Sequence, residues 1–168
     1  MAEIKSINQL LGMNLSIPDY QRPYKWSLQN IEDLLSDISN AIADAERYRQ
    51  PFKYRIGTII VHQNENGVFD VVDGQQRVIS LTLLKLFLQP DFQCSILKKD
   101  FSNKISQSNI HANYTFIKEW FSLKSQDAKA GVNRAMDEIL EVVVICVDKV
   151  SEAFQLFDSQ NARGKALD

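Results

Sequence analysis

Residues 71–77 read VVDGQQR and join a run of β-branched residues to an almost continuous apolar run that ends at Leu88. We expect a strand before Asp73 and a largely buried helix from Gln76 onward. The first turn of a helix carries unpaired N–H groups and the positive end of the helix dipole, so it attracts anions and disfavours cations. Arg77 lies in that turn and therefore needs a carboxylate, a phosphate or bulk water opposite its guanidinium.

Two interpretations of this turn are open. In the first, Asp73 caps the helix by accepting a hydrogen bond from the N–H of Gln76, whose side chain reaches back, while Gly74 permits the tight turn. In the second, the glycine-entered helix start after a strand binds an anion. The two interpretations are compatible, but capping alone leaves Arg77 unexplained.

Residues 18–26 form a segment that two prolines keep extended and that carries basic and aromatic side chains. Alternate side chains of an extended chain share one face. Either this face packs its aromatic rings on the domain, or Arg22 and Lys25 contact phosphate while an aromatic ring stacks on a base. The side chains that share the face are Tyr20, Arg22, Tyr24 and Trp26.

The last residues, 161–168, read as a polar loop that contains Asn161, Arg163 and Gly164. Such a loop is either simply solvated or closes over a phosphate or a ribose. Chains seldom finish on a loop of this kind. We therefore expect residues 1–168 to form one domain in the N-terminal part of a longer protein.

Hydrophobic periodicity and turn residues predict an α+β domain in which helices and strands alternate along the chain. The stretch from Asp91 to Asn109 is polar and weakly patterned, and we expect it to be a mobile connection. The predicted strands are residues 15–17, 54–62, 68–72 and 141–147, and the predicted helices are residues 6–11, 28–49, 76–88, 110–123, 127–140 and 151–160.

Composition argues against several classes of function. The net charge of -2 gives no overall basic surface for nucleic acid. Neither the two cysteines nor the two histidines have metal-ligand spacing. A signal peptide and a membrane-length apolar run are both absent from the sequence, so we expect a cytoplasmic protein. The chain also lacks a Walker P-loop, G-x-G-x-x-G, a nucleophile elbow and a recognisable nuclease motif.

Three segments, IPDYQRPYKW (17–26), FDVVDGQQRVISLTLL (69–84) and FDSQNARGKAL (157–167), resemble the DUF262 family in order and spacing. This family is the N-terminal domain of GmrSD-type, modification-dependent restriction enzymes and related phage-defence proteins. The resemblance covers nearly the whole chain. It implies a ParB/sulfiredoxin-like fold, a small mixed sheet with surrounding helices, and places any nuclease in a C-terminal HNH-type domain or subunit outside this chain.

In that fold the strand–turn–helix arginine segment binds a nucleotide phosphate, so the resemblance implies a nucleoside-triphosphate site. The ligand would be GTP, CTP or ATP, together with Mg²⁺. By the resemblance, the catalytic residues are Asp73, Gln76 and Arg77, and the nucleotide-binding residues are Gln21, Arg22, Tyr24, Trp26, Gly57, Gly74, Gln75, Asn161, Arg163 and Gly164.

Our first hypothesis is a regulatory domain of a DNA restriction system that binds and hydrolyses a nucleoside triphosphate. Arg77 would hold a phosphate together with the N–H groups of residues 75 and 76, and Arg22 and Arg163 would complete the phosphate cage. Asp73 would orient the turn, bind Mg²⁺ or position the attacking water, and the sequence does not choose among these roles.

Two alternative hypotheses remain. A DNA-reading module of the same fold, without hydrolysis, would use the basic and aromatic face of residues 22–26. An assembly domain would keep the motif without its activity. The partners we expect are a nucleotide, DNA through the full-length protein, the nuclease domain or subunit, and a second copy of the chain in a homodimer.

Overall fold

The computed structural model describes residues 1–18, 23–48, 50–94, 96 and 104–161, without the side chains of residue 104 and residues 157–161. Within these residues lies a five-stranded mixed sheet in the order β1-β5-β3-β4-β2. β5 pairs antiparallel with β1 and parallel with β3, whereas β4 pairs antiparallel with β3 and parallel with β2. The strands are β1 (Ala2–Ser6), β2 (Leu15–Ser16), β3 (Tyr54–Gln63), β4 (Phe69–Asp73) and β5 (Leu140–Val147).

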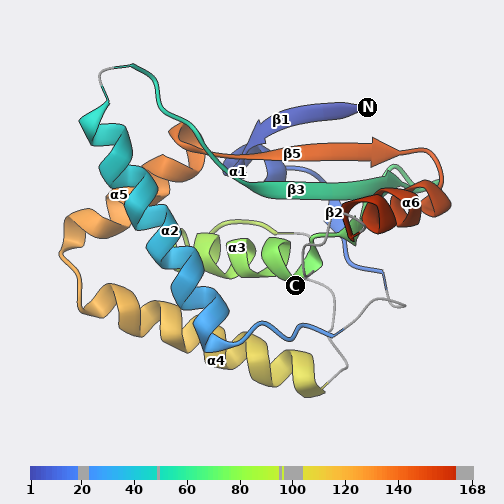
Figure 1. Cartoon of the computed structure of the whole chain (residues 1–168). Helices are drawn as coiled ribbons and strands as arrows, with labels where there is room; N and C mark the ends of the chain where they lie inside the picture. The colour runs from blue at the N-terminus through green and yellow to red at the C-terminus, as the bar shows by residue number, and fades with distance from the viewer. Residues whose placement is uncertain (19–22, 49, 95, 97–103, 162–168) are drawn as a thin grey trace.

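Helices pack on both faces of the sheet (Figure 1). The face that carries Ile59 and Val61 packs on a core shared with α2, α3, α4 and α5, and the face that carries Ile60 and Val147 packs on α6 through Ala153. The predicted α+β class, a mixed sheet with surrounding helices, is confirmed. The helices are α1 (Ile7–Leu11), α2 (Leu28–Arg47), α3 (Gln75–Leu88), α4 (Lys104–Ser122), α5 (Gln126–Glu138) and α6 (Val150–Asn161).

Local sequence signals place the ends of the early helices. Ser27 caps α2, and its hydroxyl and the side chain of Asn30 complete a capping box. Ser6 and Gln9 form the same reciprocal arrangement at the start of α1, and Gly12 is the C-cap of this helix. These contacts satisfy backbone groups that the helices leave unpaired.

The β3–β4 hairpin delivers the chain to α3. Gly67 adopts a φ of 78° in the turn between the strands, in the left-handed region that favours glycine. The register then shifts, because Val61 faces Val71 whereas Ile60 faces Asp73. This bulge places Asp73 at the end of β4, beside the middle of β3.

The helix α3 is buried on most of its surface, as its continuous apolar run predicts. Even Ser80 and Thr82 are buried, and their hydroxyls donate to the carbonyls of Gln76 and Val78 at 2.8 Å. The first turn of α3 therefore begins a helix that cannot move without repacking the core. In the described part of the chain, no helix is both long and apolar enough to cross a membrane.

Three features differ from expectation. Strand β1 is not predicted from the sequence, because Ile4 is its one large apolar residue and its pairing with β5 is long-range. The stretch 91–109 is not simply a connection, since α4 begins at Lys104 and Ile96 is buried in the core. Asn161, expected in a loop, is the last residue of α6.

Candidate functional site

Gly74, and not Asp73, is the N-cap of α3. Gly74 adopts a φ of 90°, and no side chain makes a capping hydrogen bond there. A Cβ atom on Gly74 would lie 2.5 Å from Ile59 Cδ1 and 3.3 Å from the carbonyl oxygen of Thr58, so α3 starts in close contact with β3. The capping box predicted for Asp73 is therefore wrong, because a left-handed glycine makes the turn and Asp73 remains in β4.

The first turn of α3 presents backbone N–H groups without a cap. The first hydrogen bond of the helix runs from the Val78 N–H to the Gly74 carbonyl at 3.0 Å, so the N–H groups of residues 75–77 precede the helical ladder. Gln75 is buried and secures the turn, because its Nε2 donates to the Val71 carbonyl at 2.8 Å. The first turn itself contains no acidic residue that would balance the positive end of the helix dipole.

The guanidinium of Arg77 lies against β3 at Gly57. A Cβ atom on Gly57 would meet Arg77 Nη1 at 2.5 Å and Cζ at 3.2 Å, so a glycine leaves the space that the guanidinium fills. The β3–β5 register shifts between Arg55 and Gly57, a bulge at the same place. Among the described residues, no hydrogen bond or ion pair joins Arg77 to a partner. A cation thus stands beside the end of a helix that disfavours it.

Asp73 is half-buried at the junction of β4 and α3. Burial raises the pKa of its carboxyl, while a hydrogen bond from the Gly74 N–H and the nearby charge of Arg77 act in the opposite direction. Ionisation of Asp73 is therefore less favourable than in water. Carboxyl groups perturbed by burial next to a specific cation are enriched at functional sites.

Gln76 holds the basic and aromatic segment against α3. Its Oε1 accepts a hydrogen bond from the Lys25 N–H at 2.7 Å, and its Nε2 donates to the Pro23 carbonyl at 3.1 Å. Its side chain does not reach back to cap α3, and both ends of the amide bind backbone. The geometry shows a positioning contact, and a catalytic role for Gln76 stays a prediction.

Tyr24 lies at the centre of a buried polar cluster. The residue is 1 % exposed, and its hydroxyl bonds to Ser80 Oγ at 2.7 Å and to Asn113 Nδ2 at 2.8 Å. Its N–H donates to Ser106 Oγ, and its carbonyl accepts from Asn109 Nδ2, both at 2.9 Å. Burial raises the pKa of the Tyr24 hydroxyl, which stays neutral. For Tyr24, burial favours packing over stacking on a base.

The neighbours of Tyr24 alternate between the core and the solvent, as an extended segment should. Trp26 packs half-buried on the core, and its carbonyl accepts from Asn113 Nδ2 at 2.8 Å. Lys25 is exposed between the two aromatic residues. The aromatic part of the face proposed to read DNA is therefore turned toward the core.

Sequence reasoning misses the contribution of α4 to this cluster. Ser106, Asn109 and Asn113 lie three and four positions apart, which puts them on one face of a helix. That spacing is the signal that could have found them. It is weak because serine and asparagine favour turns and caps over helix interiors.

Some predicted site residues cannot be placed. Gln21, Arg22, Arg163 and Gly164 lie outside the described residues, and the side chain of Asn161 is not described. The remaining predicted residues gather around α3 from β3, β4 and the segment before α2. They are Tyr24, Trp26, Gly57, Asp73, Gly74, Gln75, Gln76 and Arg77.

A model of one family, described as the GmrSD restriction endonuclease, N-terminal domain, matches residues 4–168. The chain belongs to this family. The match confirms the DUF262 resemblance and supports a role in restriction and phage defence, within a protein that acts on DNA. A search of curated proteins finds no significant match.

The described part of this GmrSD-type domain has no side-chain cluster that could hold a magnesium ion by itself. The described residues contain no group of three or more His, Cys, Asp or Glu side chains placed to hold a metal ion. Mg²⁺ is usually bound by one or two carboxylates together with substrate phosphates and water. The carboxylate of Asp73 meets that requirement for an ion that arrives with a triphosphate.

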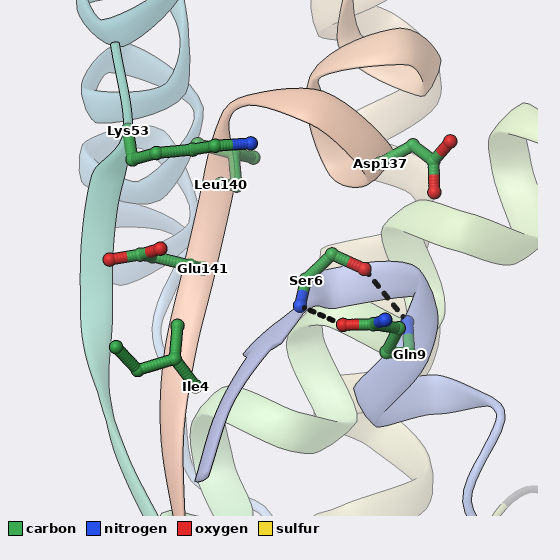
Figure 2. Close-up of a pocket in the computed structure, with 7 residues that line it drawn as sticks. All are labelled: Ile4, Ser6, Gln9, Lys53, Asp137, Leu140 and Glu141. Atoms are coloured by element: carbon green, nitrogen blue, oxygen red, sulfur yellow. Dashed lines mark hydrogen bonds between the residues drawn. The ribbon is translucent and has the colours of Figure 1, made fainter. Parts of the chain in front are cut away.

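A separate polar pocket of about 290 Å³ lies between β1, α1 and the start of β5 (Figure 2). Much of its lining is already engaged within the protein, because Glu141 pairs with Arg55 at 2.9 Å and Ser6 and Gln9 bond each other. No residue of the α3 first turn lines it. We therefore assign the candidate site to the first turn of α3.

Gly74→Ala should lower the free energy of unfolding by roughly 2–4 kcal/mol. A left-handed alanine costs about 1–2 kcal/mol, and the clash of its Cβ with Ile59 adds a penalty of similar size. Gly67→Ala is the matched control, because its φ is also positive but no atom lies within 4 Å of the new Cβ. Gly67→Ala should lower the free energy of unfolding only by the cost of the left-handed backbone conformation. Urea denaturation measures both, and equal losses would contradict the close approach of α3 to β3.

Asp73→Asn should raise the melting temperature at pH 7. Because burial raises the pKa of the folded carboxyl, the folded state binds its proton more tightly than the unfolded state, and stability falls as pH rises through that pKa. Asparagine resembles the protonated group and avoids this loss. The difference between the variant and the wild type should shrink as pH is lowered toward 3. A variant less stable at pH 7 would show that the carboxylate is net stabilising.

Proposed function

We propose that this chain binds a nucleoside triphosphate (GTP, CTP or ATP) at the first turn of α3 and hydrolyses it, as a regulatory domain of a restriction protein. The observation that carries the proposal is the Arg77 guanidinium, which rests on Gly57 beside the uncapped N–H groups of residues 75–77. Among the described residues, neither the Arg77 guanidinium nor these N–H groups have a hydrogen-bonded side-chain acceptor. A phosphate would supply that acceptor.

The chemistry of the turn suits a phosphate in three ways. The backbone N–H groups and the helix dipole attract an anion, and a planar guanidinium can bind phosphate oxygens with two parallel hydrogen bonds. The contact with Gly57 restricts the Arg77 side chain before any ligand arrives. Binding therefore costs less side-chain entropy than it would with a freely rotating arginine.

Hydrolysis requires stabilised phosphate charge and a positioned water. We assign the first task to Arg77 and the second to Asp73, whose half-buried carboxylate lies at the edge of the turn. Mg²⁺ would neutralise phosphate charge when bound, with Asp73 as its protein ligand. Asp73 does not cap the first turn of α3, although its carboxylate accepts a hydrogen bond from the Gly74 N–H.

The rest of the proposed site rests on the resemblance of the sequence motifs to the family. Gln21 and Arg22 directly precede the segment that Gln76 holds, and Arg163 and Gly164 follow α6. We include these residues and Asn161 in the phosphate or ribose contacts. The same proposal includes a ParB/sulfiredoxin-like arrangement, one domain over residues 1–168, a nuclease domain or subunit that cleaves DNA, and a homodimer.

The DNA-reading alternative has less support. Tyr24 is buried, and Trp26 packs on the core, so neither ring is free to stack on a base. Lys25 is the exposed basic residue in the described part of this segment. Arg22, the other cation of that face, lies outside the described residues, so a DNA contact is supported there by Lys25 alone.

Addition of ATP, GTP, CTP or UTP with Mg²⁺ should raise the melting temperature of the chain for at least one of the four. A ligand present at a hundred times its dissociation constant stabilises by about 2.7 kcal/mol. Titration calorimetry should then show about 10- to 100-fold weaker binding of that triphosphate by Arg77→Ala, because a charge-assisted contact is lost. Arg134→Ala, at an exposed arginine of α5, is the control and should bind normally.

Gly57→Ala should weaken binding of the same triphosphate, although the variant still contains Arg77. Its Cβ occupies the position of the guanidinium, so the flexible arginine must move while the fold is kept. Equal affinity of wild type and Arg77→Ala would remove Arg77 from the site. Stabilisation by none of the four triphosphates would overturn the proposed function.

Asp73→Asn should lower the rate of phosphate release from that triphosphate by roughly 100-fold or more, because the variant cannot position the water or share the metal ion. Its dissociation constant for the metal-free triphosphate should stay within about threefold of the wild type. Weaker binding only in the presence of Mg²⁺ would assign Asp73 to the metal ion. Unchanged turnover would exclude Asp73 from catalysis.

A further inference from the structure

The segment Pro23–Trp26 has no strand partner among the described residues, yet side chains bind its backbone on both sides. Gln76 from α3 binds the Pro23 carbonyl and the Lys25 N–H. Side chains from α4 bind the N–H and carbonyl of Tyr24 and the carbonyl of Trp26. We name these four side chains the polar clamp: Gln76, Ser106, Asn109 and Asn113.

The polar clamp joins α3 to α4 through this segment. The Tyr24 hydroxyl adds a second link, because it bonds Ser80 of α3 and Asn113 of α4. Asn113 is 1 % exposed and Ser106 is 2 % exposed, so water does not replace a lost bond easily. An unsatisfied buried polar group costs more than the bond itself contributes. The segment therefore has one favoured position relative to α3.

We propose that the polar clamp is a positioning device that docks residues 23–26 onto the first turn of α3, so that Gln76 and Asn113 control triphosphate binding without touching the ligand. The inference rests on the proposed function. Gln76 directly precedes Arg77, and its amide is turned to the segment and not to an anion. The backbone N–H of the exposed Lys25 lies 2.7 Å from Gln76 Oε1, which ties the segment to the residue directly before Arg77.

Positioning differs from the two rival roles in what it changes. A catalytic Gln76 would alter turnover and leave affinity intact, and Asn113 would have no such effect. A merely structural clamp would alter stability alone. A positioning clamp lowers triphosphate affinity when either residue is truncated, because Gln76 and Asn113 act on the same segment from different helices.

Trp26 provides a readout of the segment itself. The chain has two tryptophans, so Trp120→Phe leaves Trp26 as the sole indole emitter. Trp26 is half-buried against the core in the clamped segment. Release of the segment exposes the indole to water and should shift its emission to longer wavelength.

The experiment introduces Gln76→Ala and Asn113→Ala, singly and together, into the Trp120→Phe chain, at a temperature where circular dichroism shows every variant folded. ATP, GTP, CTP and UTP, each with Mg²⁺, are the probes. Each single variant should shift the Trp26 emission to the red and weaken binding by about tenfold. The double variant should also lose about tenfold in affinity and not a hundredfold. Either substitution alone releases the segment, so the second one has little further effect.

Two exposed amides provide matched controls, Gln155→Ala on α6 and Asn40→Ala on α2. Both should leave emission and affinity unchanged. Three results would overturn the proposal. The first is normal triphosphate affinity in Asn113→Ala, and the second is a loss of affinity in the double variant equal to the product of the two single losses. The third is slower turnover with unchanged affinity in Gln76→Ala. If the parent chain binds none of the four triphosphates, the proposed function fails, and control of binding by the clamp fails with it. If the parent chain binds a triphosphate and Asn113→Ala binds it equally well, only the role of the clamp fails.

Discussion

The close approach of α3 to β3 is the constraint on which the candidate site depends. Two glycines make it feasible, because Gly74 lets the helix begin against Ile59 and Gly57 leaves room for the guanidinium of Arg77. The same approach buries Asp73 and leaves the first N–H groups of α3 uncapped. A side chain at Gly74 would push α3 away from β3, whereas one at Gly57 would displace the Arg77 guanidinium. Geometry and electrostatics of the site thus have one common cause.

The site combines groups that are unfavourable one by one. A half-buried carboxylate, an arginine at a helix N-terminus and uncapped N–H groups each lower stability in the absence of a ligand. The surrounding contacts offset this cost. The apolar helix α3 is anchored in the core, and the hydrogen bonds of the polar clamp hold the neighbouring segment. Local instability on a rigid support is common where proteins bind charged ligands.

Elements with a local cause could be predicted from the sequence. The helix that Ser27 caps, the hairpin and the buried α3 follow from periodicity and turn chemistry. The cap of α3 could not be settled, because an aspartate three residues before a glutamine matches a capping box and a glycine turn equally well. Contact with Ile59 decides between them, and that contact is tertiary. The partners of Tyr24 were out of reach for the same reason, since Asn113 lies 89 positions away along the chain.

Long-range pairing also sets the order in which this chain can fold. The amino group of Met1 bonds the carbonyl of Cys146, 145 positions later, and Arg55 bonds Glu141 across 86 positions. Such distant pairs slow folding, because loop closure must precede the contacts that reward it. During synthesis, residues 54–88 can form their hairpin and helix early, whereas β1 must wait for β5. The first strand to be made is thus among the last to be bonded, and its backbone stays available to other chains until β5 has been made.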